Sequence, residues 1–241
     1  FYTFFWQWRT LTKLVKKHNC DILFSPGGSF FTNFKPIVTM SRNMLPFEWN
    51  ELKRFGFSFS TLIYLFLYII QGRSYSKADG LIFLTDYAKK KILANSWIKP
   101  KKTVKINHGV NDFFYKKPRK QNSIDNYNFE NPFKILYVSV INFYKHQWNL
   151  VAAINNLRSR GIPIYLTLIG PYHQPAYKIF KKKINQSDPN HQFIRYINSV
   201  PNKDLKAYYH NTDAFVFASS CENLPNILLE AIVLKKFIIS S

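Results

Sequence analysis

The sequence predicts an α/β fold in which two parallel sheets are built one after the other. Short apolar, β-favouring runs alternate with helix-like segments along both halves of the 241 residues. A polar and charged stretch, 111–131, interrupts this alternation near the middle and is typical of an interdomain linker. The strand-to-helix connections are short, which favours parallel strands with right-handed crossovers. We therefore expect two Rossmann-like domains that face a cleft.

In the first half the expected strands are Cys20–Phe24, Pro36–Met40, Gly80–Leu84 and Thr103–Ile106. The first of them enters a tight glycine turn, Ser25–Gly28. A long helix is expected from Glu48 to about Gln71 with a weak point at Gly56. A shorter helix is expected over 87–95, with Asp86 as its cap.

The second half restarts the alternation. Its expected strands are Phe133–Ser139, Ile164–Ile169, Gln192–Tyr196, Ala214–Phe217 and Phe237–Ser240. Its expected helices are Trp148–Arg160, Ala176–Ile184, Asn202–Tyr209 and Asn223–Leu234. The chain begins at Phe1 within a pattern, without an initiator methionine or a signal-peptide layout, and stops just after a strand. We therefore expect both domains to be incomplete.

The composition is globular but strongly basic. Lys and Arg total 34 against 13 acidic residues, which gives a net charge of +21. The residues up to 125 carry +14 of this excess, and the remainder carry +7. Such a charge favours anionic partners, namely nucleotide phosphates, acidic lipids or nucleic acid, without choosing among them. The cysteines Cys20 and Cys221 are expected to be buried free thiols in a reducing compartment, and their spacing indicates no metal site.

One apolar segment needs to be distinguished from a membrane span. Phe57–Ile70 holds 14 residues between Gly56 and Gln71, whereas a span needs about 20. A buried or interfacial helix is therefore expected.

The most informative segment runs from the strand Asp213–Phe217 through a turn into a helix. The strand is apolar and typical of a buried parallel strand. Glu222 lies in the turn, and Glu230 lies eight positions later, about 80° further round the helix axis. Both carboxylates can face a ligand at the carboxyl edge of the sheet, where each can accept hydrogen bonds from sugar hydroxyls. Taken alone, the pair also fits an amphipathic helix with two surface glutamates.

This two-glutamate motif resembles the signature of the family-four glycosyltransferases of the GT-B fold. Further segments resemble the same family, in order along the chain: Ala78–Lys89, Lys105–Asn111, Phe133–Lys145 and Leu168–Pro171. The first 77 residues match more loosely, through Ser25–Gly28 and Arg42–Phe47. The resemblance implies part of an acceptor-side domain at 1–115, a linker at 116–131 and a truncated donor-binding domain at 132–241.

The resemblance also implies roles for individual residues. Lys145 occupies the family position of the diphosphate-binding lysine, and Glu222 would orient the donor sugar, so these two are the expected catalytic residues. Glu230 would hold the ribose. The remaining expected donor-binding groups are Ser139 and the backbone N–H groups of Asn223, Leu224 and Asn226 at the start of the helix.

One family feature is absent. An arginine usually lies five residues before the lysine and follows a glycine, but here those positions hold Val140 and Ser139. His146 or Arg195 is a candidate for the missing cation. Other residues expected near the cleft are Gly27, Gly28, Arg42, His108 and Arg195. His108 also fits a structural role, and no catalytic base is assigned.

The resemblance implies transfer of a sugar from a UDP- or GDP-linked donor to a glycan or lipid-linked acceptor, with retention, in cell-surface polysaccharide or lipopolysaccharide synthesis. No cofactor, metal or nucleic acid is expected. The protein is expected to be bacterial and cytoplasmic, peripheral at the inner membrane face, with its basic amino-terminal part on anionic lipid. The alternatives are a non-enzymatic polyanion or nucleic-acid binder, and another GT-B nucleotide-sugar enzyme such as an epimerase.

Overall fold

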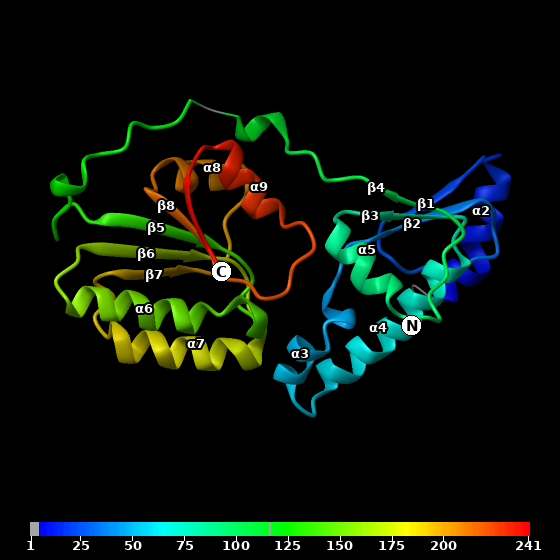
Figure 1. Cartoon of the computed structure of the whole chain (residues 1–241), viewed down its shortest axis with the longest axis horizontal. Coiled ribbons are helices and arrows are strands. Elements are labelled where there is room, and N and C mark those ends of the chain that lie inside the picture. Colours follow the sequence, from blue (N-terminus) through cyan, green and yellow to red (C-terminus); the bar gives the residue numbers. More distant parts are fainter. Residues whose placement is uncertain (1–4, 116) are drawn as a thin grey trace. The chain divides into compact units, whose positions relative to one another are not determined.

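The computed structural model describes residues 5–115 and 117–241, which form two compact α/β units (Figure 1). By their contacts, the first unit comprises residues up to 108 together with 221–224, and the second comprises 109–220 and 225–241. Each unit is built on its own parallel sheet, which confirms the expected fold class. Lys116, the first residue of the expected linker, lies outside the described residues.

The first unit contains a four-stranded sheet in the order β1-β2-β3-β4, and all neighbouring strands are parallel. The strands are β1 (Leu23–Ser25), β2 (Ile37–Ser41), β3 (Gly80–Phe83) and β4 (Thr103–Lys105). All four expected strands are therefore present, with ends that differ by at most three residues. The largest difference is at β1, which begins at Leu23 because Cys20 and the two residues after it are exposed and outside the ladder.

The long helix expected in this unit is interrupted. Gly56 has φ +58° and ends a short 3₁₀ turn, Lys53–Phe55, that follows α3 (Trp49–Leu52). Helix α4 then runs from Phe59 to Lys77, six residues further than expected. Ser58 begins it, because its side chain accepts a hydrogen bond from Thr61 N. The weak point at Gly56 is thus a full break between two helices.

The cap of the next helix differs from the prediction. Helix α5 (Asp86–Leu93) is capped by Thr85, whose hydroxyl accepts a hydrogen bond from Ala88 N at 3.1 Å. Asp86 is instead the first helical residue, where a carboxylate is favourable near the positive end of the helix dipole. It also pairs with Lys105 at 2.5 Å. Helix α2 (Thr12–Lys17), preceded by a π-helical turn at Gln7–Leu11, had not been expected.

Helix α4 leaves an apolar face uncovered within its unit. Its exposed apolar residues are Phe59, Leu62, Ile63, Phe66 and Ile69. They recur at helical spacing, so they lie on one side of the helix axis. Its last turns are buried, with Tyr75 fully inaccessible and stacked on Phe47 at 6.0 Å between ring centroids. None of the helices in the described ranges combines the length and the apolar character that a membrane crossing requires.

The second unit contains a five-stranded parallel sheet in the order β7-β6-β5-β8-β9. Its strands are β5 (Phe133–Val138), β6 (Ile164–Ile169), β7 (Ile194–Ile197), β8 (Ala214–Phe217) and β9 (Phe237–Ser240). Helices α6 (Gln147–Ser159) and α7 (Gln174–Ser187) lie on one side of this sheet, and α8 (Asn202–His210) and α9 (Asn226–Val233) lie on the other (Figure 1). The strand order reverses between β5 and β8, next to the middle of the sheet.

The segment before β5 is fastened to the second unit by a buried carboxylate. Asp213, which is 2% exposed, accepts hydrogen bonds from Tyr127 Oη at 2.9 Å and Lys134 N at 2.8 Å, and pairs with Arg119. Beside it, Lys236 Nζ donates to the carbonyl oxygens of Thr212 at 2.8 Å and His210 at 3.0 Å. Burial lowers the pKa of Lys236 to about 8. Asp213 therefore joins the segment 119–134 to the start of β8, and Lys236 fastens the start of β9 beside it.

The two cysteines are free thiols. Cys221 is buried as expected, but Cys20 is exposed because it lies in the connection between α2 and β1. The expectation of two buried thiols is therefore wrong for Cys20.

We predict that Asp213→Ala destabilises the second unit by about 3–5 kcal/mol, because it leaves Arg119 and the N–H of Lys134 without their buried acceptor. Asp213→Asn should lower the free energy of unfolding by less, since the amide oxygen can still accept the hydrogen bond from Lys134 N. Urea unfolding followed by fluorescence measures both, with the exposed Asp125→Asn as the control. A loss for Asp213→Ala within about 1 kcal/mol of that control would show that Asp213 does not hold these segments together.

Candidate functional site

At the carboxyl edge of the second sheet, two loops are bonded to each other. One loop follows β5 and contains Tyr144 and His146, and the other follows β8 and contains Ser219 and Ser220. The carbonyl oxygen of Tyr144 accepts from Ser220 N at 2.9 Å and from Ser219 Oγ at 3.2 Å. His146 Nε2 and Ser220 Oγ are 2.8 Å apart. These two serines therefore fix the neighbouring loop through both backbone and side-chain hydrogen bonds.

Lys145 lies inside this pair of loops. It ends a 3₁₀ turn, Phe143–Lys145, that Asn142 caps by accepting from Phe143 N at 2.8 Å. Its residue exposure is 6%, and its ammonium nitrogen lies 5.2 Å from the ring centroid of Tyr144 and 5.6 Å from that of Phe217. Cation–π attraction offsets part of the cost of removing the charge from water. Lys145 is therefore a packed side chain rather than a solvated loop lysine.

The end of β5 is held against the end of β6. Ser139 is buried, and its N–H donates to Ile169 O at 2.8 Å. A Cβ atom on Gly170 would lie only 2.2 Å from Ser139 O, and Gly170 has φ +148°. Any side chain at position 170 would thus push the two strand ends apart. His146, at the other end of the loop, has φ +53° and begins α6.

Helix α9 begins later than expected. Its first residue is Asn226, and Pro225 precedes it as an N-cap without a side-chain hydrogen bond. Proline restricts the residue before it to extended backbone, so Leu224 cannot be helical. Of the three expected donors, only Asn226 therefore lies in the first helical turn. By their contacts Glu222, Asn223 and Leu224 group with the first unit, so their roles toward a donor stay predictions.

Glu230 lies on α9 and is held by a tyrosine. Tyr209, the last but one residue of α8, is fully buried, and its hydroxyl lies 3.2 Å from Glu230 Oε2 and 3.1 Å from Ile227 O. Burial raises the pKa of Glu230, while the bond from Tyr209 lowers it. Among the described residues, no group donates to Glu230 Oε1. One oxygen is thus oriented and the other can accept from a ligand.

The structure separates Arg195 from these loops. Arg195 is the second residue of β7 and pairs in register with Thr167 of β6. It lines a groove with Lys134, near the start of β5. Lys134 lies four residues, or about 13 Å along the strand, before the end of β5. The structure therefore does not bring Arg195 together with Lys145.

In the first unit, four of the expected cleft residues follow strand ends. Gly27 and Gly28 follow β1, and Gly28 has φ +80° with the Tyr75 hydroxyl 3.0 Å from where its Cβ would be. Arg42 follows β2. His108 follows β4, and its pKa is lowered first by burial and second by the charge of Arg42. Arg42 and His108 are thus close enough to interact, whereas Gly27 has open space around it.

No local pattern in the sequence indicates the contact of Tyr209 with Glu230, because it joins two helices 21 positions apart. The contact of His146 with Ser220 spans 74 positions and was missed for the same reason. Within the described ranges, no three His, Cys, Asp or Glu side chains are grouped so that they could hold a metal ion.

The chain belongs to the family of glycosyl transferases group 1. The sequence pattern of this family matches residues 118–241, just over half of the chain. A search among curated proteins found no match.

Solved structures share the fold at low sequence identity. HepE from Anabaena, in complex with UDP, is 14% identical with a TM-score of 0.63 over 95% of this chain and 62% of HepE. Sucrose-phosphate synthase from Thermosynechococcus elongatus is 15% identical, with a TM-score of 0.69 over 96% of this chain and 58% of the synthase. WaaG, a glycosyltransferase involved in lipopolysaccharide biosynthesis, is 14% identical, with a TM-score of 0.67 over 95% of this chain and 62% of WaaG.

These likenesses and the two parallel-sheet units confirm the expected GT-B fold. The chain spans about three fifths of the length of these solved proteins.

We predict that Glu230→Gln lowers affinity for a nucleotide about tenfold or more, because a hydrogen bond to a charged acceptor is worth about 1.5–3 kcal/mol. Folding should be unimpaired, since a raised pKa means that the ionised carboxylate is disfavoured in the folded unit. Titration calorimetry with UDP and GDP gives the affinity, and thermal melting gives the stability. Asp125→Asn is the control. Unchanged affinity for both nucleotides contradicts a ribose contact.

Proposed function

We propose that the protein transfers a sugar from a UDP- or GDP-linked donor to a glycan or lipid-linked acceptor, with retention of anomeric configuration. The observation that carries this proposal is the bonded pair of loops after β5 and β8, with Lys145 buried between aromatic rings. Membership of the glycosyl transferase family supports the reaction class. HepE, solved with UDP and with UDP-glucose, supports the donor class.

The chemistry needs positive charge where the nucleoside diphosphate departs. A fixed ammonium group in a partly desolvated site stabilises the developing negative charge without reorganising water. Lys145 supplies this group, and Glu230 holds the ribose through its free oxygen. Glu222 orients the donor sugar. The departing phosphate oxygen accepts the acceptor's proton, so the transfer proceeds without a cofactor, a metal or a carboxylate base.

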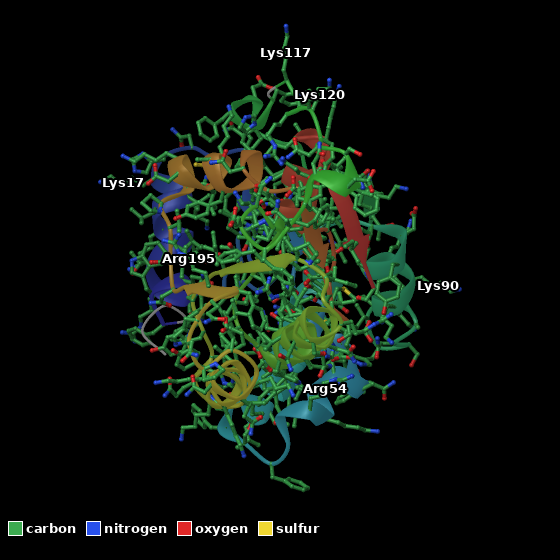
Figure 2. The ribbon with its side chains drawn as sticks, turned by 90° about the vertical axis from the view of Figure 1, so that its left-hand side faces the viewer. Lys17, Arg54, Lys90, Lys117, Lys120 and Arg195 are labelled. Atoms are coloured by element: carbon green, nitrogen blue, oxygen red, sulfur yellow. The ribbon has the colours of Figure 1, made fainter. Side chains whose placement is uncertain are left out.

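A polyanion or nucleic-acid binder is less well supported. Binding of that kind uses basic side chains gathered on one face or along one helix. In the first unit, the basic residues labelled in Figure 2 come from three separate elements: α2 (Lys17), the turn before α4 (Arg54) and α5 (Lys90). In the second unit Lys117 and Lys120 precede the sheet, and Arg195 lies on β7.

Lys145→Met should lower turnover about 10²–10³-fold, because it removes the charge while keeping an apolar stem against the rings of Tyr144 and Phe217. The melting temperature should change little, since the substitution also removes the cost of burying an ammonium group. Release of UDP or GDP from a nucleotide sugar measures the turnover. Lys178→Met, on α7, is the matched control. Near-normal turnover of Lys145→Met would mean that other groups hold the diphosphate.

We further propose that the enzyme works on cell-surface polysaccharide or lipopolysaccharide at the cytoplasmic membrane face. WaaG, one of the similar structures, is involved in lipopolysaccharide biosynthesis. The uncovered face of α4, which includes Leu62, Ile63 and Phe66, supports contact with lipid. Lys53 is exposed just before this helix and would attract anionic head groups, whereas the neighbouring Arg54 is paired with Glu51 at 2.8 Å.

Replacing Leu62, Ile63 and Phe66 together by serine should abolish flotation with vesicles of acidic lipid, because it removes the apolar contact of α4. High salt should weaken binding of the unchanged protein, because it screens the attraction of basic residues to acidic lipid. That attraction contributes roughly 1 kcal/mol of binding free energy per well-placed Lys or Arg. The control replaces three exposed isoleucines of the second unit, Ile162, Ile179 and Ile232, by serine. If the α4 variant floats as well as the control, α4 does not bind the membrane.

A further inference from the structure

The second unit has a groove that the proposed transfer does not use. It encloses about 550 Å³, which is within the range of small-molecule sites in proteins. Its walls are one face of β5, β6 and β7, the ends of α6 and α8, and the residues just before β5. It lies on the amino-terminal half of β5, whereas Lys145 follows the carboxyl end of that strand.

The sheet face in this groove is polar. Lys134 pairs in register with Tyr165, and Thr167 pairs with Arg195, so the four side chains lie on the same face of neighbouring parallel strands. On β6, Tyr165 and Thr167 alternate with Leu166 and Leu168, which are fully buried on the opposite face. A strand that is covered by apolar packing on both faces has a nearly continuous hydrophobic sequence. Here the polar alternation indicates a face made for water or a polar ligand.

The groove carries excess positive charge. Three cationic side chains line it, Lys134, Arg158 and Arg195, against one carboxylate, Glu130. None of the ion pairs among the described residues involves any of these four. The groove therefore offers cations to an incoming anion without first breaking a salt bridge.

One of these cations is held in place before any ligand arrives. The Arg158 guanidinium carbon lies 4.6 Å from the ring centroid of Phe129 and 4.9 Å from that of Phe193. Stacking of this kind restricts the side chain and leaves its N–H groups at the edge of the plane. An anion bound there would cost less conformational entropy than one bound by a free surface arginine.

The rest of the lining suits a sugar ring. Tyr165 and Tyr208 supply aromatic surface for the apolar face of a ring, and Gln192 and Asn211 supply amide donors and acceptors for hydroxyl groups. Aromatic surface, amides and arginines together match a hydroxyl-rich molecule with a negative charge. We propose that this groove is a second binding site, distinct from the donor site, for an anionic saccharide that bears a phosphate or carboxylate group.

The test uses the whole chain and four probes: glucose 6-phosphate, glucuronate, glucose and inorganic phosphate. Saturation-transfer NMR at low ionic strength should show binding of the two anionic sugars. Glucose and inorganic phosphate should each bind at least about tenfold more weakly than the anionic sugars. Glucose lacks the anionic group, and phosphate lacks the sugar ring. A saturating concentration of UDP should leave binding unchanged, which separates this groove from the donor site and from the proposed function.

Variants locate the binding. Arg195→Gln, at an exposed position on β7, should lower the affinity for glucose 6-phosphate about tenfold. Glu130→Gln should raise this affinity by removing a repelling charge. Arg160→Gln is the control, because Arg160 is exposed nearby at the end of α6 but does not line the groove. The proposal is overturned by no saturable binding of either anionic sugar, by displacement with UDP, or by equal losses for Arg195→Gln and Arg160→Gln. Inorganic phosphate binding as tightly as glucose 6-phosphate would overturn the saccharide assignment.

Discussion

The reversal of strand order between β5 and β8 is the constraint on which the second unit depends. Because these two strands are parallel neighbours, the loops that follow them emerge side by side at one edge of the sheet, while their connecting helices lie on opposite faces. Lys145 and the serines at 219 and 220 are 74 or more positions apart in sequence, yet the sheet makes them adjacent. Tyr144 O and the His146 imidazole then bond the two loops directly.

The same pair of strands is fixed at its other end by Asp213. This carboxylate binds the backbone of β5 at Lys134 and the preceding segment at Tyr127 and Arg119. A register shift between β5 and β8 would therefore break bonds at both ends. The position of Lys145 depends on this register, since the ring of Phe217 that faces its ammonium group is the last residue of β8.

Much of this architecture could be predicted from residue patterns. The limits of β6, β8 and β9 follow from apolar runs between turn residues. The family motifs make Lys145 and Glu230 candidates, and their roles stay predictions. Two features could not be predicted because they depend on tertiary contact or backbone detail: the hold of Tyr209 on Glu230 and the full break of the long helix at Gly56. The later start of α9 is a local effect of Pro225, which restricts Leu224 to extended backbone. Charge alone makes Arg195 a candidate for the missing cation beside Lys145, whereas its position on β7 places it on the sheet face.

Lys236 has a consequence for proton exchange on folding. Its pKa in the folded unit is about 8, below its ordinary value of 10.5. Below pH 8 both folded and unfolded chains hold this proton, and the cost of burying the ammonium group is present in full. Between pH 8 and 10.5 the folded unit has released the proton and the unfolded chain has not, so at this residue the free energy of unfolding rises with pH. In that interval, folding of the second unit acidifies the solution.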